Sequence, residues 1–144
     1  MADEHLPSIK TGVKFGGGAP PGYEWNVDLF EQAFEEASEI LDEEQYDSIA
    51  DEVRELARQS DPTHSQTVDV RSVEDLFEVR AKGGILGKLN IRVFYFVNKP
   101  TRKIIVLGVI KKENNGPTPT GDKLRMRRRK RLYLEKYPNP TIDN

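Results

Sequence analysis

Cysteine is absent from this chain of 144 residues, and only two histidines are present. Without cysteine there is no disulfide and no thiolate metal site. His5 and His64 lie far apart in the sequence, with neither metal-ligand spacing nor a Ser or Cys partner. A Walker phosphate loop needs Gly at Lys82 and Ser or Thr at Leu89, so the glycines between them predict no nucleotide site. We therefore expect no metal and no small-molecule cofactor.

Long apolar runs are also missing. No stretch approaches the roughly 18 apolar residues of a membrane span. Residues 1–10 lack the basic and then apolar pattern of a secretory signal. These absences predict a soluble, cytoplasmic protein without a membrane partner.

The charges that are present separate along the chain. Residues 1–78 hold 20 Asp and Glu but 5 Lys and Arg, whereas residues 79–144 hold 17 Lys and Arg but 4 Asp and Glu. The formal net charge of -2 therefore hides a strongly basic half. A basic segment of this density, with aromatic residues among the cations, is typical of a polyanion-binding surface. We expect the polyanion to be nucleic acid.

The composition is consistent with a single domain. A hydrophobic fraction of 36% is enough for one modest core. Residues 1–21 end in a glycine- and proline-rich segment that cannot bury enough surface to offset chain entropy. We predict a flexible N-terminal tail over residues 1–21, a domain over residues 22–137, and a C-terminal tail over residues 138–144.

Two helices are expected in the acidic half, after a short β-prone run over residues 23–27. From Asp28 to Leu41, apolar residues recur with helical period. A second helix follows at once, because Asp42 and Gln45 have the spacing of a capping box. Its apolar stripe consists of Tyr46, Ile49, Ala50, Val53, Leu56 and Ala57. The two helices are predicted to form a hairpin packed on one face of a sheet.

Three β-rich runs follow, over residues 76–82, 88–98 and 102–112. The segments between them carry the Gly, Asn and Pro residues of turns, so an antiparallel meander is predicted. The third run is apolar on both faces and is expected at the centre of the sheet. The predicted fold class is therefore α+β, with a small antiparallel meander, a helical hairpin on one face and a basic C-terminal helix.

The C-terminal helix is expected over residues 122–137. Few of its residues are apolar contacts for the sheet: Leu124, Leu132 and Leu134. Residues 125–131 surround most of the helix with cations, which favours contact with nucleic acid or an acidic partner over a merely solvated tract. Tyr133 and Tyr137 lie one turn apart, and either stack on bases or have the more usual role of packing on the sheet.

Cations on neighbouring strands are candidates for a phosphate site. Strand alternation places Glu78, Arg80 and Lys82 on one face of the first meander strand. The other face carries Phe77, Val79 and Ala81. We therefore predict that the charged face of this strand is not the one against the core.

The second arginine comes from the middle strand. A four-residue loop over residues 98–101 places Arg92 near Leu107, on the face that carries Lys111. A register change of one residue substitutes Lys112. Both arginines and one of these lysines would then surround a single phosphate. The alternative, equally open from the pattern, is that Arg92 pairs with Glu78 and that the lysines are solvated.

These residues resemble the RelE/HigB superfamily of type II toxins, in particular its phage-derived HigB-like branch. Residues 76–80 (LFEVR) are similar to the family's aromatic-bearing "ELR" strand, and residues 91–95 (IRVFY) to its "YRV" strand. Residues 104–112 resemble the hydrophobic strand that ends in "KK", and residues 118–119 the "TP" pair before a helix. The order of one strand, two helices, three strands and a helix also fits the family.

The resemblance covers about residues 22–135 and implies a toxin that cleaves messenger RNA, generally on the ribosome, and is restrained by a cognate antitoxin. The chemistry is coherent with this sequence, because RNA supplies its own nucleophile, the 2′-OH. Clustered cations can also lower the pKa of a lysine toward neutrality. The expected catalytic residues are Arg80, Arg92, Lys111, Lys112 and Tyr133. The expected RNA-binding residues are Lys82, Lys88, Arg125, Arg127, Arg128, Arg129, Lys130 and Arg131.

The roles of these residues follow the same resemblance. Arg80 and Arg92 are expected to hold the scissile phosphate, one of Lys111 and Lys112 to act as base or charge stabiliser, and Tyr133 to stack or donate a proton. Two other functions stay open: gyrase poisoning by a ParE-like toxin, and a non-catalytic RNA-binding or regulatory module of the same fold. The lysine pair at the end of the apolar strand favours the ribonuclease, since gyrase-directed relatives do not depend on such a site.

Overall fold

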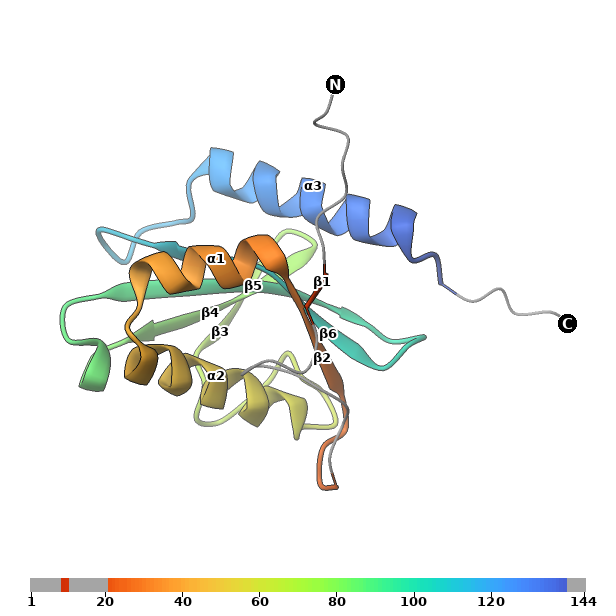
Figure 1. Cartoon of the computed structure of the whole chain (residues 1–144), viewed down its shortest axis with the longest axis horizontal. Helices are drawn as coiled ribbons and strands as arrows, with labels where there is room; N and C mark the ends of the chain where they lie inside the picture. The colour runs from red at the N-terminus through yellow and green to blue at the C-terminus, as the bar shows by residue number, and fades with distance from the viewer. Residues whose placement is uncertain (1–8, 11–20, 140–144) are drawn as a thin grey trace, which may run out of the picture.

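A mixed sheet of six strands, flanked by three α-helices, makes up the part of the chain that the computed structural model describes, residues 9–10 and 21–139 (Figure 1). The elements are β1 (Ile9–Lys10), β2 (Asn26–Phe30), α1 (Glu31–Ile40), α2 (Glu43–Ala57), β3 (Val70–Val73), β4 (Leu76–Lys82), the short 3₁₀ helix η2 (Gly84–Leu86), β5 (Asn90–Asn98), β6 (Lys103–Lys111) and α3 (Thr120–Lys136). The predicted α+β class is confirmed. Most of the two predicted tails lies outside the described residues.

The sheet has the strand order β1-β2-β6-β5-β4-β3. β4, β5 and β6 pair antiparallel, which confirms the predicted meander. β2 pairs parallel with β6, so β6 lies inside the sheet, and its residues from Ile104 to Ile110 are all buried. The predicted central place of this strand is confirmed, because an apolar strand needs cover on both faces. The edge strands β1 and β3 were not predicted.

The β2 strand extends further than the sequence predicts. It runs to Phe30, and α1 begins at Glu31, so the prediction that the helix starts at Asp28 is wrong. The four residues from Val27 to Phe30 are all buried, and Leu29 lies opposite Val106 of β6. A short apolar run buried on both faces has no period that separates a strand from a helix.

The second helix forms as its sequence predicts. The capping box is present: the Gln45 amide donates to Asp42 Oδ1 at 2.8 Å, and the Asp42 amide donates to Gln45 Oε1 at 3.0 Å. These bonds satisfy two of the amides that a helix leaves free at its first turn. The buried residues of α2 are the six of the predicted stripe: Tyr46, Ile49, Ala50, Val53, Leu56 and Ala57.

The helices cover the sheet from both sides, with α2 and α3 on opposite sides of it (Figure 1). α1 runs against β6, and its buried residues Ala33 and Ala37 are small enough for a close approach. β2 stops pairing with β6 at Val106, so the Val109 amide beyond that point has no β2 partner. The Glu36 carboxylate of α1 accepts from this amide at 3.0 Å, and so satisfies a buried backbone donor.

The C-terminal helix forms, and one of its three predicted contact leucines, Leu134, packs against the core. Leu124 is 59% exposed, and Leu132 and Leu134 are partly buried. The buried residues of α3 are Met126, Arg129 and Tyr133. They share one face of the helix. The prediction is therefore confirmed for Leu134, but it missed the buried face of α3, where an arginine occupies one of the buried positions.

Candidate functional site

A buried polar cluster holds one of the two predicted phosphate-binding arginines. Arg92 and Glu78 are both completely buried, with Arg92 Nη1 3.8 Å from Glu78 Oε2. The Thr118 hydroxyl joins them: it donates to Glu78 Oε1 at 2.6 Å and accepts from Arg92 Nη1 at 3.1 Å. Arg92 Nη2 also donates to the Gly116 carbonyl at 2.6 Å.

The prediction that the charged face of β4 lies away from the core holds for Arg80 and Lys82 and is wrong for Glu78, which is buried. The segment before α3 folds over that face and covers Arg92, so the guanidinium has no surface from which to hold a substrate phosphate. Burial lowers the pKa of the Arg92 guanidinium, and the nearby Glu78 carboxylate acts in the opposite direction. Of the alternatives that the sequence left open, the structure has Arg92 pairing with Glu78.

Of the two lysines at the end of β6, Lys111 does not lie on the face of Arg92, and the register substitutes Lys112 there. Lys111 lies opposite Ile91, and Arg92 lies opposite Ile110 rather than Leu107. The β5–β6 turn lies one residue further along the chain than expected, and an irregularity after Phe94 adds one more residue to β6. Together these changes move the partner of Arg92 by three residues, from Leu107 to Ile110. An odd shift of register moves a side chain to the other face of the sheet.

Lys112 follows the strand end. Its amide donates to the Asn90 carbonyl at 2.8 Å, and its Nζ lies 3.3 Å from Asn114 Oδ1. Lys111 is exposed. The predicted cluster of both arginines with one lysine is therefore not formed.

Arg80 is the predicted arginine that remains accessible. It lies opposite Arg92 in the β4–β5 ladder, and its side chain is 21% exposed. Its Nε donates to Glu78 Oε2 at 2.6 Å. The structure records no partner among the described residues for either terminal nitrogen of Arg80. The buried carboxylate thus orients the guanidinium and leaves two N–H-bearing nitrogens for another acceptor.

Arg80 lines a groove of about 500 Å³, which we call the β4 groove. Its lining residues come from α2, the segment before β3, the strands β3 to β5 and the segment between β6 and α3: Glu52, Thr67, Asp69, Arg71, Arg80, Ala81, Lys82, Asn90 and Asn115. Three cations on neighbouring strands, Arg71, Arg80 and Lys82, line this one groove. A groove of this size with several cations suits a phosphodiester.

Long-range contacts bring this groove together. The Arg80 amide donates to the Asp69 carbonyl at 2.9 Å, which fixes the segment before β3 alongside β4. Arg71 pairs with Asp69, its Nε 2.8 Å from Oδ1. Sequence reasoning missed Arg71, Asn90 and Glu52, since no local pattern relates them to Arg80.

Glu52 differs from the other carboxylates in the groove. It is half-buried, and no hydrogen bond or ion pair to it is recorded within the described ranges. Burial raises the pKa of its carboxyl group, and the nearby Asp69 raises it further. Glu52 lies outside the predicted apolar stripe of α2.

Tyr133 packs in the core instead of facing a substrate. It is 4% exposed, and its ring lies 6.2 Å from Phe30 and 5.7 Å from Phe96, between centroids. Tyr137 lies 5.0 Å away on the outer side. Burial raises the pKa of Tyr133 to about 12, with a smaller contribution from the Asp28 carboxylate. The predicted stacking or proton-donating role is contradicted by this burial, and the more usual packing role holds.

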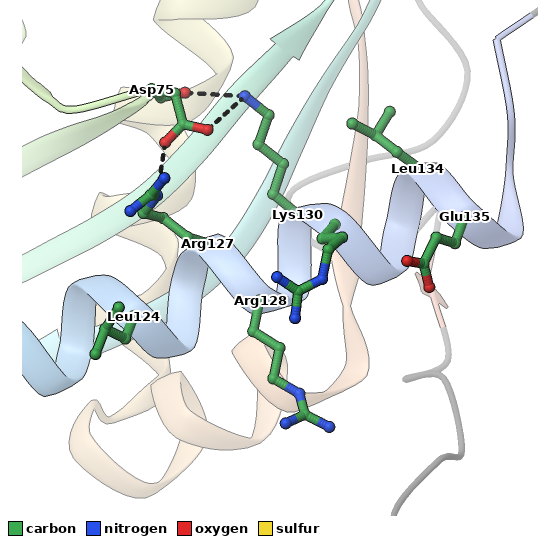
Figure 2. A pocket seen from close by; sticks show the side chains of 8 residues that line it. Asp75, Leu124, Arg127, Arg128, Lys130, Leu134 and Glu135 are labelled. Atoms are coloured by element: carbon green, nitrogen blue, oxygen red, sulfur yellow. Dashed lines mark hydrogen bonds and ion pairs between the residues drawn. The ribbon is translucent and has the colours of Figure 1, made fainter.

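The cations of α3 divide into paired and unpaired groups. Arg129 is buried, and its guanidinium lies 2.8 Å from Glu36 Oε2 and 2.8 Å from the Leu107 carbonyl. Arg127 and Lys130 both bind Asp75, at 3.1 and 3.3 Å (Figure 2).

Arg125 pairs with Asp122 at 2.9 Å. Arg128 and Arg131 are exposed, and no ion pair is recorded for either within the described part of the chain. Of the predicted RNA-binding residues, Arg129 is therefore committed to the fold, whereas Arg128 and Arg131 are the most available. Figure 2 shows Arg128 pointing away from Asp75.

The outer side of α3 also carries a shallow groove of about 660 Å³. Its lining includes the apolar Leu124 and Leu134, together with Arg128 and Arg131. The two other predicted RNA-binding residues lie elsewhere: Lys82 lines the β4 groove, and Lys88 is exposed just before β5. The available cations thus form two surfaces, one at the β4 groove and one on α3.

Comparisons with protein-family models, with curated proteins and with solved structures gave no match. Among the described residues, no helix combines the length and apolar character needed to cross a bilayer. In the same ranges, no group of three or more His, Asp or Glu side chains is placed to hold a metal ion.

Proposed function

We propose that this chain is the toxin of a type II toxin–antitoxin pair, similar to the RelE/HigB superfamily, and that it cleaves messenger RNA. Two features support this proposal. The residue patterns over β4, β5 and β6 resemble that superfamily. The element order β2, α1, α2, β4, β5, β6, α3 is the order expected for it, with the edge strand β3 added before β4. On this proposal its partners are messenger RNA, the ribosome and a cognate antitoxin.

The observation that carries the proposal is the geometry of Arg80. Its Nε is fixed by the buried Glu78, and its terminal nitrogens have no recorded partner in the described part of the chain. The groove that it lines also contains Arg71 and Lys82. A guanidinium held in place before substrate arrives stabilises charge that develops on a phosphorane without reorganising. Arg80 is therefore the residue that we assign to the scissile phosphate.

The buried residues of the predicted site act through Arg80. Thr118 donates to Glu78 Oε1, and Arg92 lies beside Oε2, the oxygen that also accepts from Arg80, so both set the position of the carboxylate that orients Arg80. They are positioning residues. The Lys112 amide binds the carbonyl of Asn90, which lines the groove, and its Nζ lies 3.3 Å from Asn114 Oδ1.

The test is cleavage of messenger RNA by purified protein, with and without translating ribosomes, followed by mapping of new 5′ ends. We expect Arg80→Ala to slow cleavage by about 100- to 1,000-fold, the usual effect of losing one preorganised charge. Lys99→Ala is the matched control, because Lys99 is exposed in the β5–β6 turn and does not line the groove. A wild type that cuts no RNA in either setting would contradict the proposal.

A second function is favoured by the burial of Arg92 and Tyr133. Because both side chains are buried, fewer groups remain at the surface for acid–base chemistry, as expected of a non-catalytic RNA-binding module. Salt-dependent RNA binding without cleavage would support that module. Stabilised gyrase–DNA cleavage complexes without RNA cleavage would support the ParE-like alternative instead.

A further inference from the structure

The β4 groove contains one carboxylate that the fold does not use. Asp69 pairs with Arg71, and the neighbouring Glu78 is buried beneath Arg80 and Thr118. Glu52 enters the groove from α2, half-buried, with no partner recorded among the described residues. A half-buried acid without a partner loses hydration and gains no compensating bond, so its retention requires an explanation.

The other residues that line the groove supply an explanation for the retention of Glu52. A groove lined both by cations and by a carboxylate without a partner has the two kinds of group that cleavage of a ribose phosphodiester needs: a charge stabiliser and a proton acceptor. Histidine is not required for this chemistry if a carboxylate takes the proton.

We propose that Glu52 is the general base that removes the proton from the ribose 2′-OH. This inference rests on the proposed ribonuclease function and names a catalytic residue for it. The substrate class is single-stranded RNA with a 2′-OH next to the scissile phosphate. Arg80, with Arg71 and Lys82, holds that phosphate.

The step balances without a cofactor. The Glu52 carboxylate takes the 2′-OH proton, and the 2′-oxygen forms a bond to phosphorus. The bond from phosphorus to the 5′-oxygen breaks, and that oxygen takes a proton from water. The products are a 2′,3′-cyclic phosphate and a 5′-OH end, and Glu52 returns its proton to water.

The surroundings of Glu52 suit this role. Burial and Asp69 raise the pKa of its carboxyl group, which makes the ionised form a stronger base. The charged groups that share the groove are Asp69, Arg71, Arg80 and Lys82. The neighbouring acids on its own helix are both engaged: Asp51 with Arg54, and Glu55 with Arg58 and Gln59.

The experiment compares wild type, Glu52→Gln and Glu52→Asp on one RNA oligonucleotide over a range of pH. Loss of a general base typically costs about 100- to 10,000-fold in rate. We expect Glu52→Gln to lose this much in kcat, and Glu52→Asp to keep part of the activity. Wild-type kcat should rise with pH through ionisation of Glu52, and the Gln variant should lose that rise.

Two controls separate catalysis from folding and binding. Glu44→Gln makes the same change of charge on an exposed residue of α2 and should leave the rate unchanged. Binding of an uncleavable 2′-O-methyl RNA should be no weaker for Glu52→Gln than for wild type, because removing a negative charge does not oppose an anion. Circular dichroism checks the fold of each variant.

The outcomes distinguish this inference from the function on which it rests. If wild type cleaves RNA and Glu52→Gln cleaves it equally fast with the same pH profile, the role of Glu52 is overturned and the ribonuclease stands. If Glu52→Gln loses binding as much as rate, Glu52 is a binding residue and the inference also fails. A wild type that never cleaves RNA overturns both.

Discussion

Arg92 Nη1 lies 3.8 Å from Glu78 Oε2, and both side chains are completely buried beneath the segment that leads into α3. This relationship reverses the expected role of Arg92, from a contact of the substrate to a support of the site. Because Arg80 shares the Glu78 carboxylate, the buried pair couples the stability of the fold to the geometry of the β4 groove.

Replacing Arg92 with Met should destabilise the protein strongly. The change leaves the buried Glu78 carboxylate without its nearest buried cation, which typically costs about 3–5 kcal/mol. Urea unfolding measures the free energy of unfolding, and Arg128→Ala, an exposed change on α3, should differ from wild type by less than about 0.5 kcal/mol. An Arg92→Met variant that keeps full stability while RNA cleavage is lost would return Arg92 to the substrate site.

Gly108 marks the place where α3 crosses β6. A Cβ built there would meet Met126 and lie 2.7 Å from Arg129 Nη1. We expect Gly108→Ala to cost about 1–3 kcal/mol, since overpacking forces side chains or backbone to move. Gly121→Ala in α3 is the matched control: nothing lies within 4 Å of its Cβ, so we expect it to stabilise by about 0.5–1 kcal/mol. Thermal unfolding measures the stability of both variants. Equal changes in stability for Gly108→Ala and Gly121→Ala would contradict close packing at Gly108.

Asp42 should contribute to stability through the capping box alone. Its carboxylate accepts from the Gln45 amide at 2.8 Å at the start of α2. Asp42→Ala should lower the free energy of unfolding by about 1 kcal/mol. Asp42→Asn keeps an accepting oxygen and should retain most of this stability, as chemical denaturation can test. If both variants lost the same stability, the cap would not be the cause.

Tyr133 should make stability fall at high pH. Its pKa in the folded protein is about 12, above the ordinary value of 10, so the folded state holds the proton more tightly than the unfolded state. The contribution is therefore complete below pH 10 and is lost as the pH rises toward 12. We expect Tyr133→Phe to lose less stability than wild type across this window, measured by urea unfolding at several pH values. An identical pH dependence for both proteins would show that Tyr133 ionises normally.

RNA affinity should depend on salt through the unpaired cations of α3. Each phosphate neutralised on a single strand contributes about −0.7 to the log–log salt slope. Replacing Arg128 and Arg131 with Ala should make the slope shallower by about 1.4 in all. Arg127→Ala should have a smaller effect, because Glu74 and Asp75 already neutralise that residue. Fluorescence anisotropy with a labelled RNA measures the slope, and no change for the double variant would exclude this face of α3 from RNA binding.

Local patterns in the sequence determined much of the fold. The stripe and cap of α2, the meander and the central place of β6 follow from periodicity, a four-residue capping motif and turn residues. Each of these signals depends on residues near one another in the chain. The start of α1 was mispredicted for the same reason, because the buried run that ends in Phe30 has no distinguishing period.

The candidate site was decided by the tertiary structure. An extra residue after Phe94 set the register that turns Lys111 away from Arg92, and no side-chain pattern marks such an irregularity. The partners that bury Arg92 and Arg129, Glu78 with Thr118 and Glu36 with the Leu107 carbonyl, lie between 14 and 93 residues away in sequence.

The same is true of the β4 groove, which Glu52 of α2 and Arg80 of β4 both line. The sequence by itself determined which charges the protein carries and which elements carry them. Whether each charge is buried, paired or available was decided only when distant elements packed together, because desolvation and pairing depend on neighbours in space rather than in sequence.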